Sequence, residues 1–108
     1  MKKGEIWIVE FPALNGHEQA GTRPVIIMAD TEANISIIIP FTSNIQALRL
    51  PHTIEVEASK ENGLSSKSVA LVFQIRAIDK KRMKKKIGVI DPAAIKRVDN
   101  MLKTILKI

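Results

Sequence analysis

The chain has 108 residues, 45% of them hydrophobic and 26% charged, a balance that favours one globular domain over residues 1–108 and argues against a disordered segment. Lys and Arg outnumber Asp and Glu by 17 to 11, and the resulting net charge of +6 favours a polyanionic partner, either a nucleic acid or an acidic protein segment. With no cysteine and two histidines, a disulfide framework and a thiolate nucleophile are excluded, and a zinc site is not expected.

The amino terminus resembles the start of a signal peptide only over Met1–Lys3. Glu5 and Glu10 interrupt the apolar stretch that should follow it. No stretch approaches the roughly 18 apolar residues of a membrane span. We therefore expect a soluble, cytoplasmic protein without a membrane partner.

The first predicted strand is Glu5–Phe11, which is apolar, rich in β-favouring residues and ended by Pro12. It contains the single tryptophan, Trp7. We expect this ring to pack in a core or an interface rather than to stack on a nucleobase.

Two further strands are expected at Pro24–Ala29 and Ile35–Phe41, with a turn at Asp30–Asn34 between them. Their hydrophobicity is continuous and does not alternate, which indicates burial on both faces, as in a small closed barrel or a dimer. Because Pro40 cannot donate to a ladder, its strand should lie near an edge or be bulged there.

The second half of the chain predicts three more strands. Thr53–Glu57 alternates and should be buried on one side, whereas Ser68–Phe73 should be buried throughout. Ser59–Ser66 is turn-like. The basic run Lys80–Lys86 is compatible with a short helical turn, and Lys86–Ile90 with a last short strand.

The last element should be a helix from Pro92 to about Lys107. Asp91 suits its N-cap and Pro92 its first position. One face of this helix is apolar: Ile95, Val98, Leu102 and Ile105, widened by Met101 and Leu106. Five or six strands with one helix predict an α+β domain, mainly β, built as a small barrel.

The link between the first two strands, Gly16–Pro24, carries the side chains best suited to chemistry. Cleaving RNA without a metal requires a proton acceptor for the ribose 2′-OH, stabilisation of the charge on phosphate, and a proton for the leaving oxygen. Glu18 and His17 are the candidate acceptors, and Arg23 offers a planar cationic fork for phosphate oxygens.

Neutral donors and further cationic groups complete the candidate set. Thr42 and Ser43 can donate to the same phosphate, and Gln74 and Arg76 can contact a base edge or a phosphate, or join two strands or two subunits. The candidate RNA-binding residues are Gln19, Thr22, Ser43, Gln74 and Arg76.

Each catalytic candidate also has a purely structural interpretation. Glu18 and Arg23 could form an ion pair that fixes the loop, and His17 could be an exposed loop residue. Thr42 and Ser43 often satisfy backbone groups at strand ends.

Four blocks of the sequence together resemble the MazF/PemK family of toxin endoribonucleases from bacterial type II toxin–antitoxin modules. The blocks are Lys3–Trp7, Gly16–Gln19 with Gly21–Pro24, Pro40–Ser43, and Gln74–Arg82. A lone Gly-x-Glu-Gln would be a weak signal, but four blocks in the right order span nearly the whole chain.

The resemblance implies an SH3-like small barrel (CcdB/PemK-like) with a C-terminal helix, assembled as a homodimer. It implies sequence-specific cleavage of single-stranded RNA without metal or cofactor, giving a 2′,3′-cyclic phosphate and a 5′-OH. The implied partner is a cognate MazE-like antitoxin, whose acidic, apolar tail occupies the RNA-binding surface. Operator DNA would be met only through that antitoxin.

By position, Arg23 matches the family's catalytic arginine, Thr42 the threonine paired with it in one branch, and Glu18 a glutamate implicated in another. His17 lies where the PemK-like branch has a functional histidine. That branch also has an Arg and an Asp where this chain has Leu71 and Phe73, so this chain cannot use that pair. We therefore expect Arg23 to stabilise the pentacovalent phosphorus, with Thr42 assisting.

Two other functions remain open from sequence. One is a non-catalytic CcdB-like toxin that inhibits a protein target such as DNA gyrase. The other is a regulatory module that binds nucleic acid without cutting it, with an affinity that falls as salt rises.

Overall fold

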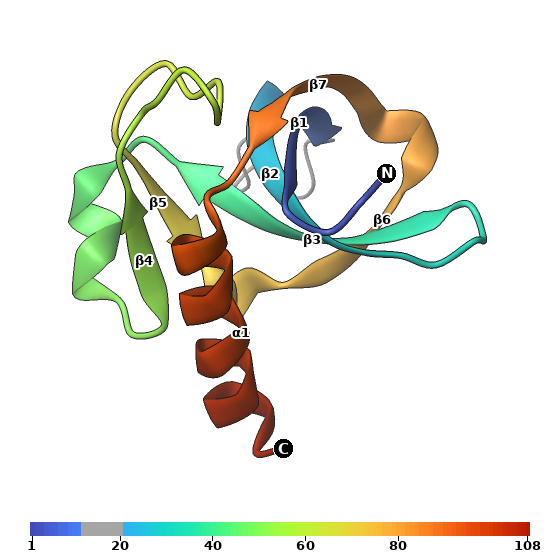
Figure 1. Ribbon diagram of the computed structural model, residues 1–108. Helices are drawn as coiled ribbons and strands as arrows, with labels where there is room; N and C mark the ends of the chain where they lie inside the picture. The colour runs from blue at the N-terminus through green and yellow to red at the C-terminus, as the bar shows by residue number, and fades with distance from the viewer. Residues whose placement is uncertain (12–20) are drawn as a thin grey trace.

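Seven strands, three short 3₁₀ helices and one α-helix are present in the computed structural model, which describes residues 1–11 and 21–108 (Figure 1). In chain order these are β1 (Glu5–Phe11), β2 (Gly21–Asp30), β3 (Ile35–Thr42), η1 (Ile45–Arg49), β4 (Thr53–Val56), β5 (Ser68–Leu71), η2 (Val72–Gln74), β6 (Arg76–Asp79), η3 (Lys80–Arg82), β7 (Met83–Val89) and α1 (Pro92–Leu106).

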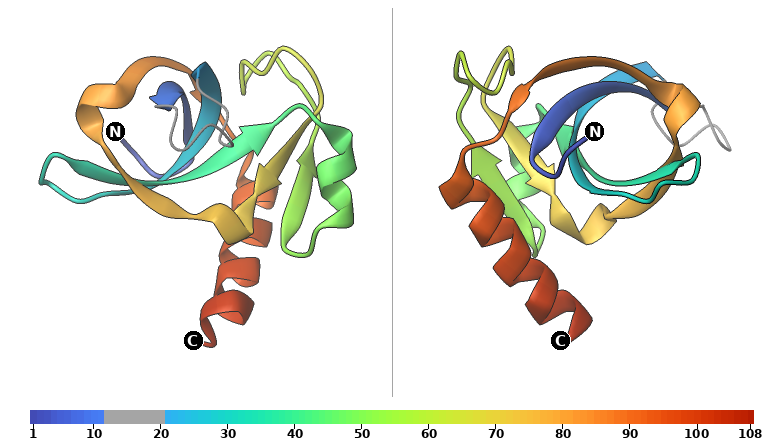
Figure 2. Two further views of the ribbon diagram at one scale, coloured as in Figure 1. Left: turned by 180° about the vertical axis from the view of Figure 1, so that it is seen from behind. Right: turned by 45° about the vertical axis from the view of Figure 1, so that its right-hand side comes forward.

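The strands form one antiparallel sheet in the order β4-β5-β3-β2-β1-β7, with β6 also paired to β3. Strands β1, β2, β3, β6 and β7 curve into a ring, best seen in the right-hand view of Figure 2. Strands β4 and β5 and helix α1 lie outside this ring (Figure 1). The expected mainly β fold, a small barrel with a C-terminal helix, is confirmed.

Both faces of the curved sheet are buried. On β2, Val25 and Ile27 belong to one hydrophobic cluster, whereas Ile26 and Met28 belong to another. The barrel cluster contains Val9, Phe11, Val25, Ile27, Ile38 and Ile78. The helix-side cluster contains Ile6, Ile26, Met28, Ile39, Phe41, Ile54, Val56, Leu64, Ala70, Val72, Ile90, Ala94 and Val98. Burial on both faces explains why the predicted strands were apolar without alternation.

The expectation that Pro40 marks an edge strand is wrong, because β3 lies between β2 on one side and β5 and β6 on the other. Its bulge with β2 is at Ile27/Ala29, away from Pro40. Residues 35–38 pair with β6, and Phe41 and Thr42 pair with β5. Pro40 lies between these two segments and pairs with neither strand there, which explains how a central strand accommodates a proline.

The predicted strand Ser68–Phe73 is too long. It ends at Leu71, and η2 follows, which leaves Phe73 39% exposed instead of buried. The cause is the pairing with β3, where Phe41 pairs with Ala70 and Ile38 pairs with Arg76. Three residues on β3 therefore correspond to six residues between β5 and β6. The 3₁₀ turn accommodates the extra residues between β5 and β6.

The basic run forms the predicted short helical turn as η3, but the strand after it begins at Met83 and not at Lys86. Pairing with β1 extends it, because Lys84 lies 3.9 Å from Glu10 and Lys86 lies 3.2 Å from Glu5. Acidic residues on β1 therefore allow a lysine-rich segment to form an edge strand.

Helix α1 agrees with its prediction except at Leu106, which is 53% exposed and does not pack with the apolar face. The Asp91 carboxylate accepts from the backbone N–H of Ala94 at 2.9 Å, and the helix ends at Leu106, with Lys107 in the left-handed conformation. Its apolar face packs on the helix-side cluster through Ile95, Met101, Leu102 and Ile105. No helix in the described ranges is long and apolar enough to cross a membrane.

Trp7 packs against the barrel cluster, as expected, and also holds a carboxylate. Its indole N–H donates to Glu5 at 2.9 Å, and Lys86 lies on the other oxygen of that carboxylate. The Trp7 hydrogen bond, followed by a backbone hydrogen bond at Lys2 and by Lys86, keeps the pKa of Glu5 below its ordinary value of 4.5, against the opposing effect of burial. Ionised Glu5 therefore stabilises the junction of β1 and β7.

We predict a pH dependence of stability from this carboxylate. Because the folded-state pKa is lowered, its contribution should be complete at neutral pH. It should begin to fall near 4.5 and be lost as pH drops through the folded-state pKa. Glu5→Gln should lower the unfolding free energy by about 1–2 kcal/mol at neutral pH and flatten the acid limb. Trp7→Phe, which keeps a ring but removes the donor, should have an intermediate effect. Urea unfolding across pH measures both, and identical pH profiles for Glu5→Gln and the parent would contradict the assignment.

Candidate active site

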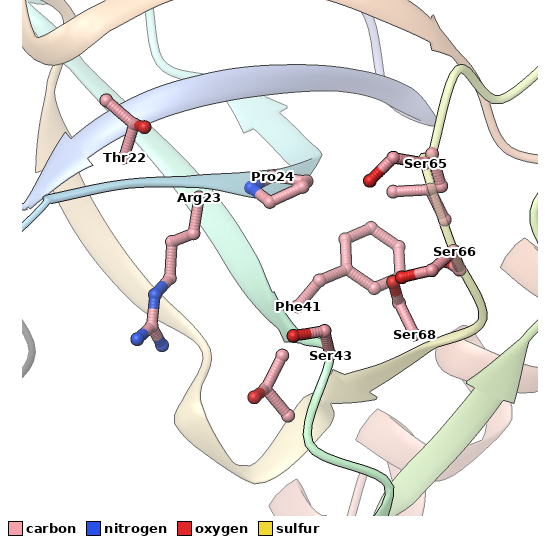
Figure 3. A pocket seen from close by; sticks show the side chains of 10 residues that line it. Thr22, Arg23, Pro24, Phe41, Ser43, Ser65, Ser66 and Ser68 are labelled. Atoms are coloured by element: carbon pink, nitrogen blue, oxygen red, sulfur yellow. The ribbon is translucent and has the colours of Figure 1, made fainter.

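A pocket of about 240 Å³ opens beside the start of β2 and the end of β3 (Figure 3). These two strand ends lie together, opposite the turn that connects the strands. Four of the sequence-predicted site residues line the pocket: Thr22, Arg23, Thr42 and Ser43. The other lining residues are Pro24, Phe41, Leu64, Ser65, Ser66 and Ser68. Three segments that are well separated in sequence thus contribute to one concave surface.

The β2–β3 ladder brings Arg23 and Thr42 to this surface. Val25 pairs with Pro40, and Arg23 and Thr42 lie two residues beyond these positions on the adjacent antiparallel strands. Each is also fixed from its other side, since Arg23 pairs with Val9 of β1 and Thr42 pairs with β5. The β2–β3 pairing itself ends at Val25 and Pro40, so β1 holds the backbone of Arg23 and β5 holds that of Thr42.

The Thr42 side chain satisfies a backbone group at the strand end, as its structural interpretation predicts, and it still has a hydrogen to donate. Its Oγ1 accepts from the backbone N–H of Asn44 at 3.2 Å. A hydroxyl has one proton to donate and two lone pairs. The Thr42 hydroxyl can therefore still donate to an acceptor bound in the pocket.

Arg23 and Arg76 meet over one aromatic ring, an arrangement that the sequence did not indicate. The guanidinium of Arg76 lies 4.3 Å from the centroid of the Phe11 ring, and that of Arg23 lies 5.9 Å from it. Phe11 is 5% exposed and belongs to the barrel cluster. Cation–π attraction to this buried ring restrains both side chains. Arg23 lines the pocket, whereas Arg76 is not among the described residues that line it.

Four other predicted site residues are not placed at the pocket. Gln74 is exposed in η2 and is not among the described residues that line the pocket. His17, Glu18 and Gln19 lie outside the described residues. The identity of the proton acceptor, and a pairing of Glu18 with Arg23, therefore stay predictions.

Three serines on the far wall of the pocket were missed by the sequence, which predicted only a turn at Ser59–Ser66. Ser65 and Ser66 are exposed, whereas Ser68 is 5% exposed and donates to the carbonyl of Ser66 at 3.0 Å. They belong to the serine loop, residues 59–67, and to the start of β5. The run of three serines within four positions was the available signal.

Asn62 holds the serine loop from within. This side chain is 5% exposed, and its oxygen accepts from the backbone N–H groups of Ser59 at 3.0 Å and of Leu64 at 2.9 Å. Its amide nitrogen donates to the carbonyl of Glu57 at 2.8 Å. Leu64 is thereby anchored in the helix-side cluster, immediately before the exposed serines.

Two glycines let the loop pack directly on the end of β7. Gly63 has a φ of +71°, and a Cβ there would lie 2.1 Å from the carbonyl oxygen of Ile87. A Cβ on Gly88 would lie 2.4 Å from the carbonyl oxygen of Glu61, which accepts from the N–H of Val89 at 2.9 Å. Because of these backbone contacts, the position of the serine loop depends on β7.

Chemically, the pocket combines a cationic fork with hydroxyl donors. Arg23 can bind two oxygens of a tetrahedral anion, and Thr42 and Ser43 can donate to others. In the described ranges no group of three His, Cys, Asp or Glu side chains is placed to hold a metal ion. Metal independence stays a prediction for the assay below.

Residues 2–106 match a protein-family model described as "PemK-like, MazF-like toxin of type II toxin-antitoxin system". The chain is 32% identical over 106 residues to Endoribonuclease MazF of Staphylococcus saprophyticus, which covers 94% of this chain and 88% of the relative. It is 34% identical over 106 residues to Endoribonuclease EndoA of Bacillus subtilis, over 94% and 90% of the two chains.

Solved structures share the fold. Form I of MazF from Deinococcus radiodurans superposes with a TM-score of 0.81 at 19% identity, covering 100% of this chain and 97% of that one. The Mycobacterium tuberculosis toxin MazF-mt6 gives a TM-score of 0.75 at 17% identity, with 96% and 97% covered.

We predict that Asn62 contributes strongly to stability through the serine loop. Asn62→Ala should lower the unfolding free energy by about 2–4 kcal/mol, because it leaves the backbone N–H of Leu64 buried without its acceptor. The matched control is Asn44→Ala, which removes a single exposed hydrogen bond to the N–H of Gln46 and should cost about 0.5–1 kcal/mol. If both variants lose the same unfolding free energy in denaturant, the hydrogen bonds of Asn62 contribute no more than the single hydrogen bond of Asn44.

Proposed function

The chain belongs to the PemK-like, MazF-like toxins of type II toxin–antitoxin systems, which makes it an endoribonuclease toxin, and we propose that it cuts single-stranded RNA with Arg23 and Thr42 at the scissile phosphate. The observation that carries the proposal is that these two side chains line one pocket. An arginine and a hydroxyl on the same phosphodiester supply the charge stabilisation that such a reaction needs, beside a proton acceptor and a proton source.

In the proposed reaction the ribose 2′-OH loses its proton and its oxygen attacks the adjacent phosphorus. The bond from phosphorus to the 5′-oxygen breaks, and that oxygen takes up a proton from solvent water. The products are a 2′,3′-cyclic phosphate and a 5′-OH. Because the nucleophile is the 2′-OH, DNA is not a substrate.

Arg23 acts by electrostatic stabilisation, since its guanidinium holds its protons too tightly to serve as a general acid. Negative charge grows on the non-bridging oxygens as the pentacovalent phosphorus forms, and a fixed cation binds that state more tightly than the substrate. Thr42 donates a hydrogen bond to the same oxygens. Glu18, ahead of His17, is the proposed proton acceptor.

The proposed partners are an RNA strand and an acidic antitoxin. The net charge of +6 attracts both to the protein. The Deinococcus relative has also been solved as a MazE-MazF complex, at 22% identity to this chain and with a TM-score of 0.77. We propose that a MazE-like antitoxin blocks the pocket of this chain, which acts as a homodimer in the cytoplasm, and that operator DNA is contacted only by the antitoxin.

The test is cleavage of a single-stranded RNA by purified protein in EDTA. Arg23→Ala should slow the cut at least about 1,000-fold, because it removes the cation at the developing charge. The matched control is Arg97→Ala, which removes an exposed arginine of α1 away from the pocket and should leave the rate unchanged. Unimpaired cleavage by a folded Arg23→Ala protein would refute the mechanism.

A second test concerns the hydroxyl. Thr42→Val preserves shape and should slow cleavage roughly 100-fold, whereas Thr42→Ser keeps the donor and should retain most of the rate. Circular dichroism controls for folding, because the valine also loses the hydrogen bond to Asn44. If Thr42→Ser is as slow as Thr42→Val, the methyl group of Thr42, and not its hydroxyl, supports cleavage.

The two other functions open from sequence make different predictions in the same assay. A toxin directed at a protein target leaves RNA intact in a mixture of protein and RNA alone. A binding module retains RNA, with an affinity that falls with salt, but releases no cyclic phosphate.

A further inference from the structure

We propose that Ser65 and Ser66 form a wall that reads one unstacked nucleobase, that of the nucleotide next to the phosphodiester held by Arg23. The inference rests on the proposed function for the identity of the ligand. It adds a specificity site and the reason for its selectivity.

The shape of the pocket separates a phosphate end from a base end. In Figure 3, Arg23 lies on one side and Ser65 and Ser66 on the other, with Pro24 and Phe41 between them. The pocket volume of about 240 Å³ is below the roughly 300–1,000 Å³ of sites for drug-sized ligands, and suits a single ring system.

The apolar surface between the two ends suits the face of a base. Pro24 and Phe41 lie in this part, and Leu64 also lines the pocket; Phe41 and Leu64 belong to the helix-side cluster. Proteins recognise single-stranded RNA by lifting a base out of its stack, covering its face with apolar or aromatic groups and hydrogen-bonding its edge. A floor of this kind beside hydroxyl groups provides both contacts.

The hydroxyls of Ser65 and Ser66 are available for such an edge. Both residues are exposed, and Figure 3 shows their oxygens turned towards the middle of the pocket. Neither hydroxyl forms a hydrogen bond with another residue in the described part of the chain. Ser68 differs, because its hydroxyl is used within the loop on the carbonyl of Ser66.

Charge favours a neutral base over a second phosphate at this wall. The adjacent cation, Lys67, binds the carboxylates of Glu55 on β4 at 3.0 Å and of Glu57, just after β4, at 3.3 Å. Those two carboxylates raise the pKa of Lys67 and draw its charge to β4. Uncharged hydroxyls are then left to meet the ligand, and they can both donate to and accept from a base edge.

Rigidity lets hydroxyls discriminate. A serine on a mobile loop could adjust to any base, but Asn62, Gly63 and Lys67 fix this loop to β4 and to the end of β7. A fixed polar group left unpaired by the wrong base costs binding energy, so the selectivity follows from the fixed position.

The experiment is cleavage of a randomised RNA pool followed by sequencing of the cut ends. The parent should prefer certain bases at positions near the cut. In a Ser65→Ala/Ser66→Ala variant, the preference at one position flanking the cut should fall about five-fold or more, from the loss of one or two hydrogen bonds, while the other positions keep theirs. Thr104→Ala, an exposed hydroxyl on α1, is the control and should change nothing.

Unchanged preferences at every position would overturn the proposal, and so would a uniform loss of rate without a change in preference. The single variants Ser65→Ala and Ser66→Ala replace the double variant if it does not fold. They are judged by the same shift at one position.

A second measurement separates this proposal from the proposed function. The protein is titrated with the four ribonucleoside 3′-monophosphates and followed by amide NMR. We expect shifts at Ser65 and Ser66 that differ between bases and weaken in the alanine variants. If the parent cuts no RNA but shows these shifts, the proposed function fails and the base site stands. If the shifts are absent or equal for all four bases, the base site is refuted whether or not RNA is cut.

Discussion

The site depends on the antiparallel ladder between β2 and β3. Its hydrogen bonds set Val25 opposite Pro40, and the same geometry carries Arg23 and Thr42 to the pocket that both line. A ladder is a demanding constraint, because a slip of one residue would turn a side chain to the other face of the sheet. Burial of β2 and β3 on both faces opposes such a slip, since it would exchange the residues of the barrel cluster for those of the helix-side cluster.

The two walls of the pocket are fixed by different means, which suit different tasks. On the wall formed by β2 and β3, pairing with β1 and β5 holds the backbone, and the Phe11 ring lies against the guanidinium of Arg23. The opposite wall is a loop without regular structure, held by the Asn62 side chain and by backbone packing at Gly63 and Gly88. Chemistry on a phosphate requires donors placed in advance, and recognition of a base requires fixed hydrogen-bonding groups. In this chain of 108 residues both walls pack on the same helix-side cluster, which contains Phe41 of β3 and Leu64 of the loop.

Local features were predictable, and those set by distant partners were not. Asp91 and Pro92 signalled the start of α1, and the apolar runs signalled burial on both faces. The position of Arg23 and Thr42 on one pocket could also have been derived, since two strands around one turn form a hairpin whose open ends converge. The break after Leu71 could not, because it follows from the register of β5 and β6 against β3. The serine wall was hidden for the same reason: its place depends on contacts between Gly63 and β7.

The central claim is that Arg23 and Thr42 act on one phosphodiester, and a double-mutant cycle on cleavage tests it most directly. Rates are measured for the parent, Arg23→Ala, Thr42→Val and the double variant on one RNA in EDTA. If the two groups stabilise the same charge, the double variant should be little slower than Arg23→Ala alone, because groups that act as a unit are strongly non-additive. Losses that multiply independently would contradict the account.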